Sequence, residues 1–388
     1  MKVFFPTYGA GHVKAIVPIA DALKKFHSNV CVDILALTSS SIELDKSGLP
    51  YKKISQYRNL YTPEELDKID FYGTKFSSLH FSLTDKDTIF YYGVSICELI
   101  SEFGLEKTES LFDTYGRKIF EPLDFSRRLL LEMKPDKVFV TCGQRMELSI
   151  AKVANSLGIE VIRLLDLVIE NLTIPYDCTL CVTNELAYNY ALKSNEHLKK
   201  INITGNPNFM YENMGSNKKV KNKIVAIFTQ PGNFNIESIL DDLHKISLKM
   251  KHVMFLLKPH PNEIFEKYEL LTKKFPNNFS LSKSTESKEI ISNSIGVFTF
   301  YSSVGMEAII QNKRLIVLNY GNDKFPVDYV KMGVADKVND YNSLESTIMS
   351  FVDESPDQKF GEGYSLLKQP DNCVELILNV ILDKNELS

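Results

Sequence analysis

The sequence predicts an α/β protein made of two doubly wound, Rossmann-like domains that face each other across a cleft. Three observations support this fold class. The chain has 388 residues, which is long for a single hydrophobic core. Short apolar runs alternate with amphipathic stretches in two successive series, as in βαβ units. A polar, turn-rich segment at 206–222 separates the two series.

The first series begins with a strand over Val3–Phe5, a glycine-rich turn and an amphipathic helix over 16–26. The next predicted strands are 30–37, 137–141, 160–165, 178–183 and 201–204. We therefore expect an N-terminal domain at 1–206, with a helical or irregular insertion at about 45–121.

The second series contains predicted strands at 224–228, 253–257, 296–300 and 314–319, with a helix at 236–250. These elements predict a C-terminal domain at 207–365. The remaining residues, 366–388, have the pattern of an amphipathic helix. We expect this helix to pack back on the N-terminal domain.

Charge, hydropathy and metal-binding motifs limit the partners and the location that the sequence allows. The formal net charge of −4 gives no basic excess for nucleic-acid binding. No run of 18 apolar residues predicts a membrane-spanning helix, and the chain opens directly on a strand pattern, so a cytoplasmic location is expected.

The single CxxC, Cys178 and Cys181, lacks the further ligands of a zinc site. Asp85-Lys86-Asp87 has the form of a metal-binding DxD, but no strand precedes it, and we interpret it as a solvated loop.

The segment Lys258-Pro259-His260-Pro261 follows a predicted buried strand. The two prolines restrict the backbone around His260 and so fix the direction of its ring. In parallel sheets, ligands bind beyond the carboxyl ends of the strands. Lys258 and His260 are therefore candidates for neutralising a phosphate or diphosphate. The alternative is an ordinary turn that ends a strand.

The segment Ser302-Ser303-Val304-Gly305-Met306-Glu307 follows another predicted strand and opens a helical pattern. Ser302 and Ser303 can donate hydroxyl hydrogen bonds, or Ser303 can simply cap the helix. Glu307 lies one turn further along the same face, where a carboxylate could accept both hydroxyls of a ribose. A solvated helix glutamate is the competing interpretation. Together with His260, these residues predict a site for a phosphorylated, ribose-bearing ligand.

The first domain offers Gly9-Ala10-Gly11-His12 after its first strand. The glycines allow a tight turn and close approach of a ligand, and His12 can act as a base near neutral pH. The segment is not the dinucleotide fingerprint, because the third glycine of GxGxxG is replaced by Lys14. A tight turn with a solvent-facing histidine explains it equally well.

Further candidates follow other predicted strands. Thr229 and Gln230 could contact a base or a phosphate. Gln144 and Arg145 would face the cleft from the first domain, and Asp166 could supply a carboxylate.

With these residues identified, the chain resembles the GT-B fold glycosyltransferase superfamily. The opening 5–12 with Pro18 is similar to the start of many nucleotide-sugar enzymes. Lys258-Pro259-His260-Pro261 and 302–307 resemble the HP and serine-rich motifs of bacterial capsule and surface-polysaccharide transferases. Gly205-Asn206-Pro207 matches a turn found in these enzymes and in UDP-N-acetylglucosamine 2-epimerases.

The resemblance implies a metal-independent glycosyltransferase in polysaccharide or glycoconjugate biosynthesis. It would need no cofactor beyond its nucleotide-sugar substrate. The donor would be held by the second domain through Thr229, Gln230, Lys258, His260, Pro261, Ser302, Ser303 and Glu307. A glycan or lipid-linked acceptor would lie near Gly9, Gly11, Gln144 and Arg145, with His12 as the leading base and peripheral membrane association allowed.

Two alternatives stay open. An epimerase of the UDP-N-acetylglucosamine 2-epimerase type, or a related hydrolase, shares the His260 and Glu307 positions, and Asp166 would match one of its carboxylates. That family's pattern expects an arginine in the first turn and an acidic residue where Gly143 and Gln144 stand. A protein that binds nucleotide-sugars without catalysis is the other alternative.

Overall fold

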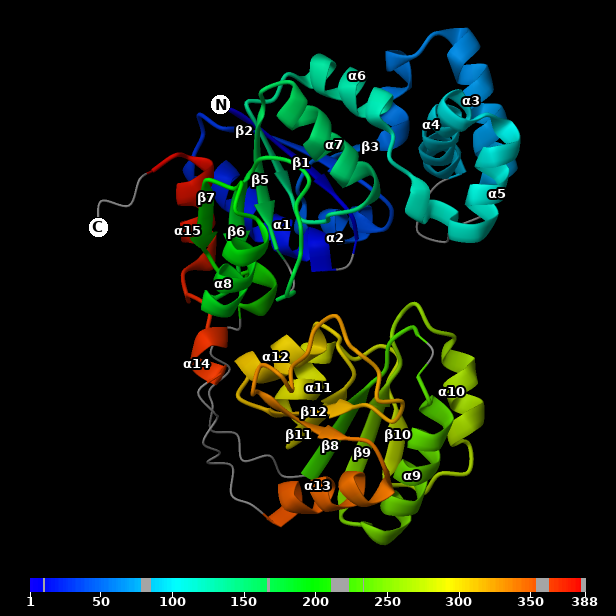
Figure 1. Cartoon of the computed structure of the whole chain (residues 1–388), viewed down its shortest axis with the longest axis vertical. Coiled ribbons are helices and arrows are strands. Elements are labelled where there is room, and N and C mark those ends of the chain that lie inside the picture. The colour runs from blue at the N-terminus through cyan, green and yellow to red at the C-terminus, as the bar shows by residue number, and fades with distance from the viewer. Residues whose placement is uncertain are drawn as a thin grey trace. The chain divides into compact units, whose positions relative to one another are not determined.

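The computed structural model describes residues 1–9, 11–77, 85–165, 168–210, 223–232, 234–353 and 363–384. The chain divides into two compact units. Unit 1 comprises 1–210 together with 369–388, and unit 2 comprises 211–368. Each unit is built on its own parallel sheet, and each is described separately below (Figure 1).

The sheet of unit 1 has seven strands in the order β3-β2-β1-β4-β5-β6-β7. Every pairing is parallel, and the central strands are apolar runs buried on both faces, as expected for such sheets. The strand order reverses between β1 and β4, which makes their carboxyl ends the topological switch point of the unit. The strands are β1 (Lys2–Thr7), β2 (Cys31–Ala36), β3 (Lys52–Lys53), β4 (Lys137–Val140), β5 (Glu160–Leu164), β6 (Thr179–Val182) and β7 (Lys200–Ile203).

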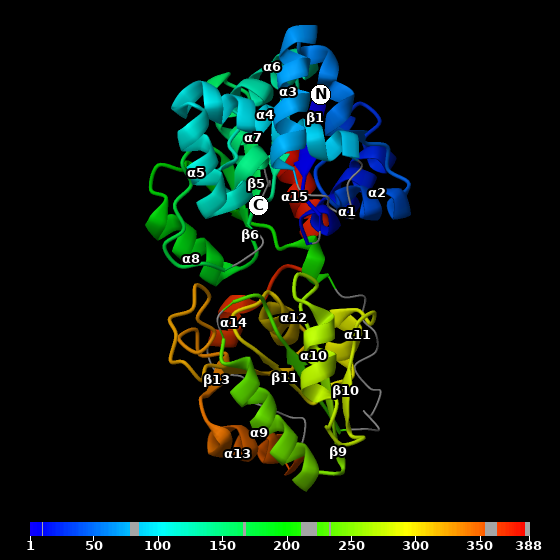
Figure 2. The same cartoon turned by 90° about the vertical axis from the view of Figure 1, so that its right-hand side faces the viewer.

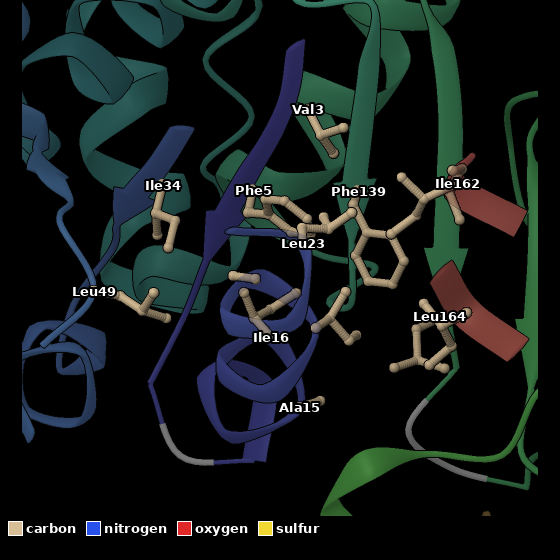
Figure 3. Packing of buried hydrophobic residues seen from close by; sticks show 14 of the residues in the cluster. Val3, Phe5, Ala15, Ile16, Leu23, Ile34, Leu49, Phe139, Ile162 and Leu164 are labelled. Carbon is tan, nitrogen blue, oxygen red and sulfur yellow. The ribbon is translucent and has the colours of Figure 1, made fainter. Parts of the chain in front are cut away.

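Helices follow most of these strands and supply the core of unit 1. Figure 3 shows Ile16 and Leu23 of α1 packing toward Phe5 and Phe139 of the sheet. The rings of Phe5 and Phe139 lie 5.4 Å apart. The helices that accompany the sheet are α1 (Gly11–Phe26), α2 (Ser40–Ser47), α6 (Leu123–Met133), α7 (Arg145–Ser156) and α8 (Glu185–Ser194), with the short turn η3 (Pro207–Phe209).

The last helix, α15 (Cys373–Ile381), belongs to unit 1 although all of unit 2 precedes it in the sequence (Figure 1). Ile377 and Ile381 are fully buried in the core that α1 and the sheet form. Beyond the helix, Asp383 pairs with the buried Lys137 of β4 at 2.7 Å. α15 is thus an integral part of the unit 1 core.

A helical region lies between β3 and α6, within the segment predicted as an insertion. It consists of η1 (Ile54–Leu60), α3 (Pro63–Phe76), α4 (Asp85–Phe103), α5 (Leu105–Tyr115) and η2 (Gly116–Ile119). Figure 2 shows α3, α4 and α5 gathered together. Asp87, predicted to lie in a solvated loop, is instead a buried residue of α4 whose carboxylate accepts the Ser55 hydroxyl at 2.6 Å. That prediction was wrong because the aspartate satisfies a neighbouring turn rather than facing water.

Unit 2 contains a six-stranded parallel sheet in the order β10-β9-β8-β11-β12-β13. Here the order reverses between β8 and β11. The strands are β8 (Lys223–Phe228), β9 (Val253–Lys258), β10 (Phe279–Leu281), β11 (Gly296–Thr299), β12 (Arg314–Leu318) and β13 (Ala335–Val338). The helices are α9 (Ile236–Lys249), α10 (Phe265–Thr272), α11 (Ser287–Ser292), α12 (Val304–Ile310), α13 (Tyr341–Asp353) and α14 (Gly363–Leu367).

The core of unit 2 lies between its sheet and the helices α9 and α13. Phe298 of β11 is fully buried there, with its ring 5.7 Å from that of Phe351. Among the described residues of either unit, no helix is long and apolar enough to cross a membrane.

Candidate functional site

The sheet order of unit 2 brings three of the predicted motifs to one edge. Strands β9, β8 and β11 are neighbours, so the segments after Lys258, Phe228 and Thr299 leave the same edge of the sheet side by side. This edge contains the switch point of the unit, where ligands of parallel sheets bind. We refer to these three segments as the unit 2 strand-end loops.

Thr229 and Gln230, directly after β8, are both buried and connect the three loops. The Thr229 hydroxyl accepts from the backbone N–H of His260 at 3.3 Å. The Gln230 Oε1 accepts from the backbone N–H of Tyr301 at 3.2 Å. Because a backbone N–H can only donate, this bond fixes the orientation of the amide and leaves its NH2 group as a donor.

Glu263, which the sequence reasoning missed, organises the loop after β9. One carboxylate oxygen accepts from the backbone N–H of His260 at 3.0 Å and from the Thr229 hydroxyl. The other accepts from the Tyr268 hydroxyl of α10 at 2.6 Å. The carboxylate therefore ties β8, β9 and α10 together beneath His260.

These bonds set the protonation and direction of the His260 ring. Its Nδ1 accepts from the backbone N–H of Asn262 at 3.0 Å, so Nε2 carries the proton of the neutral ring. Burial lowers the pKa of His260, and the charge of Glu263 acts in the opposite direction. The half-buried ring thus presents one N–H donor beyond the strand end.

Lys258, at the last position of β9, is tethered within the unit. Its ammonium donates to the carbonyl oxygen of Thr285 at 2.6 Å. Burial lowers the pKa of Lys258, while the negative charge of Glu286 opposes that shift. Pro261 is exposed at the turn between His260 and Asn262.

In the loop after β11, the side chain of Ser303 does not cap the following helix, which was one of its two predicted roles. Ser303 occupies the N-cap position of α12, but its side chain makes no capping hydrogen bond. The Ser302 hydroxyl accepts from the backbone N–H of Val304 at 3.3 Å instead. Ser303 is exposed, and Glu307 is half-buried one turn into the helix. Burial raises the pKa of the nearby Tyr329 hydroxyl, and the negative charge of Glu307 adds to that shift.

A pocket with a volume of about 400 Å³ opens beside these loops. Thr229 and Gln230 line one part of it, Glu263 and Tyr268 another, and Phe234 supplies an aromatic wall. Phe234 stacks on Phe300 with ring centroids 4.1 Å apart. The pocket therefore combines an aromatic face with an amide donor, which suits a planar ligand that carries carbonyl groups.

The corresponding edge of unit 1 is organised by Glu147, a second carboxylate that sequence reasoning missed. Glu147 is fully buried in α7 and accepts from the backbone N–H groups of Tyr8 at 3.2 Å, Thr141 at 2.8 Å and Cys142 at 2.7 Å. Burial raises its pKa, while the positive charge of His12 and the three N–H groups act to lower it. Glu147 therefore joins the carboxyl ends of β1 and β4 at the switch point.

The turn after β1 carries the candidates Gly9, Gly11 and His12. Gly9 is required by close approach, because a Cβ there would lie 1.9 Å from the Ser39 Oγ. The carbonyl of Gly11 accepts from the Asn208 side chain at 2.6 Å, which connects this turn to the Gly205-Asn206-Pro207 segment. His12 is half-buried in the first turn of α1 and close enough to Glu147 to interact electrostatically.

Gln144 and Arg145 follow β4 as predicted, but in different settings. Gln144 is exposed. Arg145 has a left-handed backbone, with φ of 55°, and its guanidinium lies over the Tyr8 ring at 4.5 Å. A non-glycine residue in this region stores strain that is frequent at functional positions. Asp166, the remaining predicted catalytic residue, lies outside the described residues.

The structure thus brings the predicted residues together in two groups. One group surrounds Thr229, Gln230, His260 and Ser302 in unit 2, and the other surrounds Gly9, His12 and Arg145 in unit 1. Within the described ranges, no cluster of three or more His, Cys, Asp or Glu side chains is arranged to hold a metal ion.

Comparison with known proteins identifies the fold. No protein-family model matches the sequence, and no curated protein has a significantly similar one. Among solved structures, the chain is similar to the UDP-GlcNAc 2-epimerase from Neisseria meningitidis bound to UDP-GlcNAc (TM-score 0.64, 15% identity, covering 99% of this chain and 100% of that chain). It is also similar to the glycosyltransferase SnogD from Streptomyces nogalater (TM-score 0.58, 12% identity, 98% and 99% covered). A third similar structure is Acinetobacter baumannii MurG (TM-score 0.53, 12% identity, 98% and 99% covered). The two parallel sheets and these similarities confirm the predicted fold class: the chain has the two-domain α/β architecture of GT-B proteins.

Proposed function

We propose that the protein is a glycosyltransferase that moves a sugar from a nucleotide-activated donor to a hydroxyl group of a glycan or lipid-linked acceptor. The observation that carries the proposal is the junction of the unit 2 strand-end loops. There, Thr229 contacts His260 and Gln230 contacts Tyr301 beside a 400 Å³ pocket. Solved proteins of this fold include enzymes with UDP-GlcNAc or UDP bound, which supports a nucleotide-sugar ligand.

In this proposal the donor binds to unit 2. The pocket lined by Gln230 and Phe234 binds the nucleobase, and Glu307 accepts hydrogen bonds from the ribose hydroxyls. The Nε2–H of His260, with Lys258 and the Ser302 and Ser303 hydroxyls, faces the diphosphate. These N–H, ammonium and hydroxyl groups stabilise the negative charge that grows on the diphosphate as it leaves.

Unit 1 supplies the catalytic general base in this proposal. His12 removes the proton of the acceptor hydroxyl as its oxygen bonds to the anomeric carbon of the sugar. The bond from that carbon to the diphosphate oxygen breaks at the same time, and the nucleoside diphosphate departs. Glu147 stabilises the imidazolium that forms, because its buried carboxylate interacts electrostatically with His12.

Calorimetry with free UDP, CMP and GDP tests the donor site. His260→Asn retains an acceptor for the Asn262 N–H but removes the ring N–H, and Glu307→Ala removes the carboxylate. Each change should weaken binding of the preferred nucleotide by about 1–3 kcal/mol, or roughly 5- to 150-fold. The matched controls are His252→Asn and Glu289→Ala, both exposed residues of unit 2, and they should bind normally. Unaltered affinity in both site variants refutes the placement.

Turnover tests the reaction. Incubation with nucleotide-sugars should release nucleotide only when an acceptor is present. His12→Asn should slow this release by about 10²- to 10⁴-fold while nucleotide affinity stays unchanged. His27→Asn, one residue beyond the far end of the same helix, is the control. Nucleotide binding without turnover under any condition would instead favour a non-catalytic binding protein.

An epimerase is the second candidate, and the comparisons give it specific support. Several similar structures are UDP-GlcNAc 2-epimerases, including those from Neisseria meningitidis and Methanocaldococcus jannaschii. This candidate predicts interconversion at C2 of UDP-GlcNAc without any acceptor. NMR of the sugar products separates the two reactions.

A further inference from the structure

The carboxyl edge of the unit 1 sheet contains a buried positive charge to which the proposed reaction gives no role. Arg163, near the end of β5, is only 5% exposed. It lies beside Val140 of β4 in the sheet register. Its guanidinium rests against the backbone of Gly143, where a Cβ would come within 2.3 Å of the Arg163 Nη2. The glycine therefore provides the space that the guanidinium occupies.

This guanidinium has no carboxylate partner among the residues that the structure describes. Arg58, Arg128 and Arg314 each pair with an acidic side chain. Arg163 forms no such pair, and its buried Nε has no hydrogen-bond acceptor within the described ranges. The buried Tyr176 hydroxyl lies close to the guanidinium and likewise has no well-formed hydrogen bond there.

Glu147 does not compensate the charge through direct contact. It is near enough to act on Tyr176, as Arg163 does. However, its two oxygens already accept from the backbone N–H groups of Tyr8, Thr141 and Cys142. An isolated buried cation is costly, because removal from water is not offset by a paired charge. A buried guanidinium without a paired charge is best explained where a bound ligand supplies the negative charge.

A second guanidinium lies close to the same loop. Arg145 stacks on Tyr8 and interacts with the Cys142 side chain, one residue before Gly143. Its backbone is strained, its Nε has no partner among the described residues, and it forms no ion pair there. Two arginines that have no carboxylate partner among the described residues thus border Cys142 and Gly143 at the strand ends.

We propose that Arg163 is an oxyanion-binding residue of unit 1. Together with the nearby Tyr176 hydroxyl, the planar guanidinium receives the carboxylate or phosphate oxygens of a ligand through two parallel hydrogen bonds, and Arg145 adds positive charge at the same loop. The assignment of that ligand as the acceptor rests on the proposed function; the oxyanion site itself does not. The acceptor would accordingly be acidic, rather than a neutral sugar.

Thermal unfolding of the full chain at constant pH and ionic strength tests the site. The probes are glucuronate and glucose 1-phosphate, which present the two kinds of anion on one sugar, with neutral glucose and sodium chloride as references. The unfolding temperature of the wild-type protein should rise with one of the two anions and not with glucose. The anion that acts identifies the group that Arg163 binds.

Substitutions then assign the effect. In chloride alone, Arg163→Gln should unfold at the same or a higher temperature than wild type, because the isolated buried charge is gone. It should show no rise with the active anion, and Arg163→Lys should require at least about tenfold more anion, since the fork geometry is lost. Arg58→Gln loses an ion-paired arginine of the same unit and should keep the full response.

Two results would overturn the proposal. One is an Arg163→Gln variant that melts earlier than wild type in chloride while wild type ignores both anions, which would make Arg163 a structural residue. The other is a response that survives in Arg163→Gln and disappears in His260→Asn, which would place the anion in unit 2. Titration with UDP keeps the two proposals separate. If UDP does not bind, only the proposed donor site in unit 2 is contradicted. The oxyanion site is tested by the difference in anion response between wild type and Arg163→Gln.

Discussion

Replacement of Glu263 by glutamine should loosen the unit 2 strand-end loops without changing the size of the side chain. The carboxylate accepts three hydrogen bonds, from the His260 N–H, the Thr229 hydroxyl and the Tyr268 hydroxyl. A glutamine can keep its oxygen toward His260 and Thr229. Its NH2 group then faces Tyr268, whose hydroxyl must rotate to accept rather than donate.

The magnitude follows from the loss of charge in these bonds. Hydrogen bonds to charged groups contribute about 1.5–3 kcal/mol and neutral ones about 0.5–1.5, so each loses about 1 kcal/mol. Three bonds give about 3 kcal/mol as an upper value, and partial exposure of Glu263 reduces it through solvent screening. We therefore expect Glu263→Gln to lower the free energy of unfolding of unit 2 by about 1.5–3 kcal/mol.

Urea unfolding followed by far-UV circular dichroism and tyrosine fluorescence measures this change, because the chain contains no tryptophan. The matched control is Glu266→Gln, an exposed glutamate of α10 three residues later, whose unfolding midpoint should not move. Nucleotide affinity should fall in Glu263→Gln as well, since the carboxylate positions the His260 backbone. A Glu263→Gln protein that unfolds at the wild-type midpoint would show that the carboxylate does not organise these loops.

Three further predictions concern packing and pH. Phe298→Ala should cost about 3–5 kcal/mol of unfolding free energy in urea titrations, because the ring is fully buried, and a smaller loss would mean that the core collapses around the gap. Gly9→Ala should lower the stability because the new Cβ would meet the Ser39 side chain, and Ser39→Gly should restore most of the stability; no rescue would contradict the geometry. The folded-state pKa of His260 lies below its unfolded value, so the unfolded chain binds the proton first and stability should fall as pH drops below about 6.5. In pH-dependent urea titrations, His260→Asn should show a smaller fall than wild type, and parallel curves would count against it.

The fold and the strand-end motifs could be predicted from the sequence because their signal is local. Apolar runs mark the central strands, and the residues after each run necessarily reach the same edge of a parallel sheet. This reasoning places Thr229, His260 and Ser302 in one candidate site from the sequence alone. The two-residue strand β3 could not be predicted, because Lys52–Lys53 has no apolar pattern.

The residues that hold these edges together were missed for a physical reason. Glu147 and Glu263 act on backbone N–H groups of other segments, and such contacts have no local sequence pattern. A weak signal existed in each case, since both carboxylates lie close to a helix N-terminus just after a strand-end loop. Arg163 was detectable in another way: it is a cation inside the apolar run Val161–Leu165, where a charge needs an explanation.

The return of α15 to unit 1 has a consequence for how the protein is made. Ile377 and Ile381 fill space beside α1, and Asp383 adds a second ion pair to the buried Lys137, which Glu160 also contacts. During synthesis these groups emerge from the ribosome only after every strand of unit 2 has been translated. The nascent first unit must therefore wait with an uncovered apolar surface, open to chaperones and to misassociation, until the second unit has already had time to form.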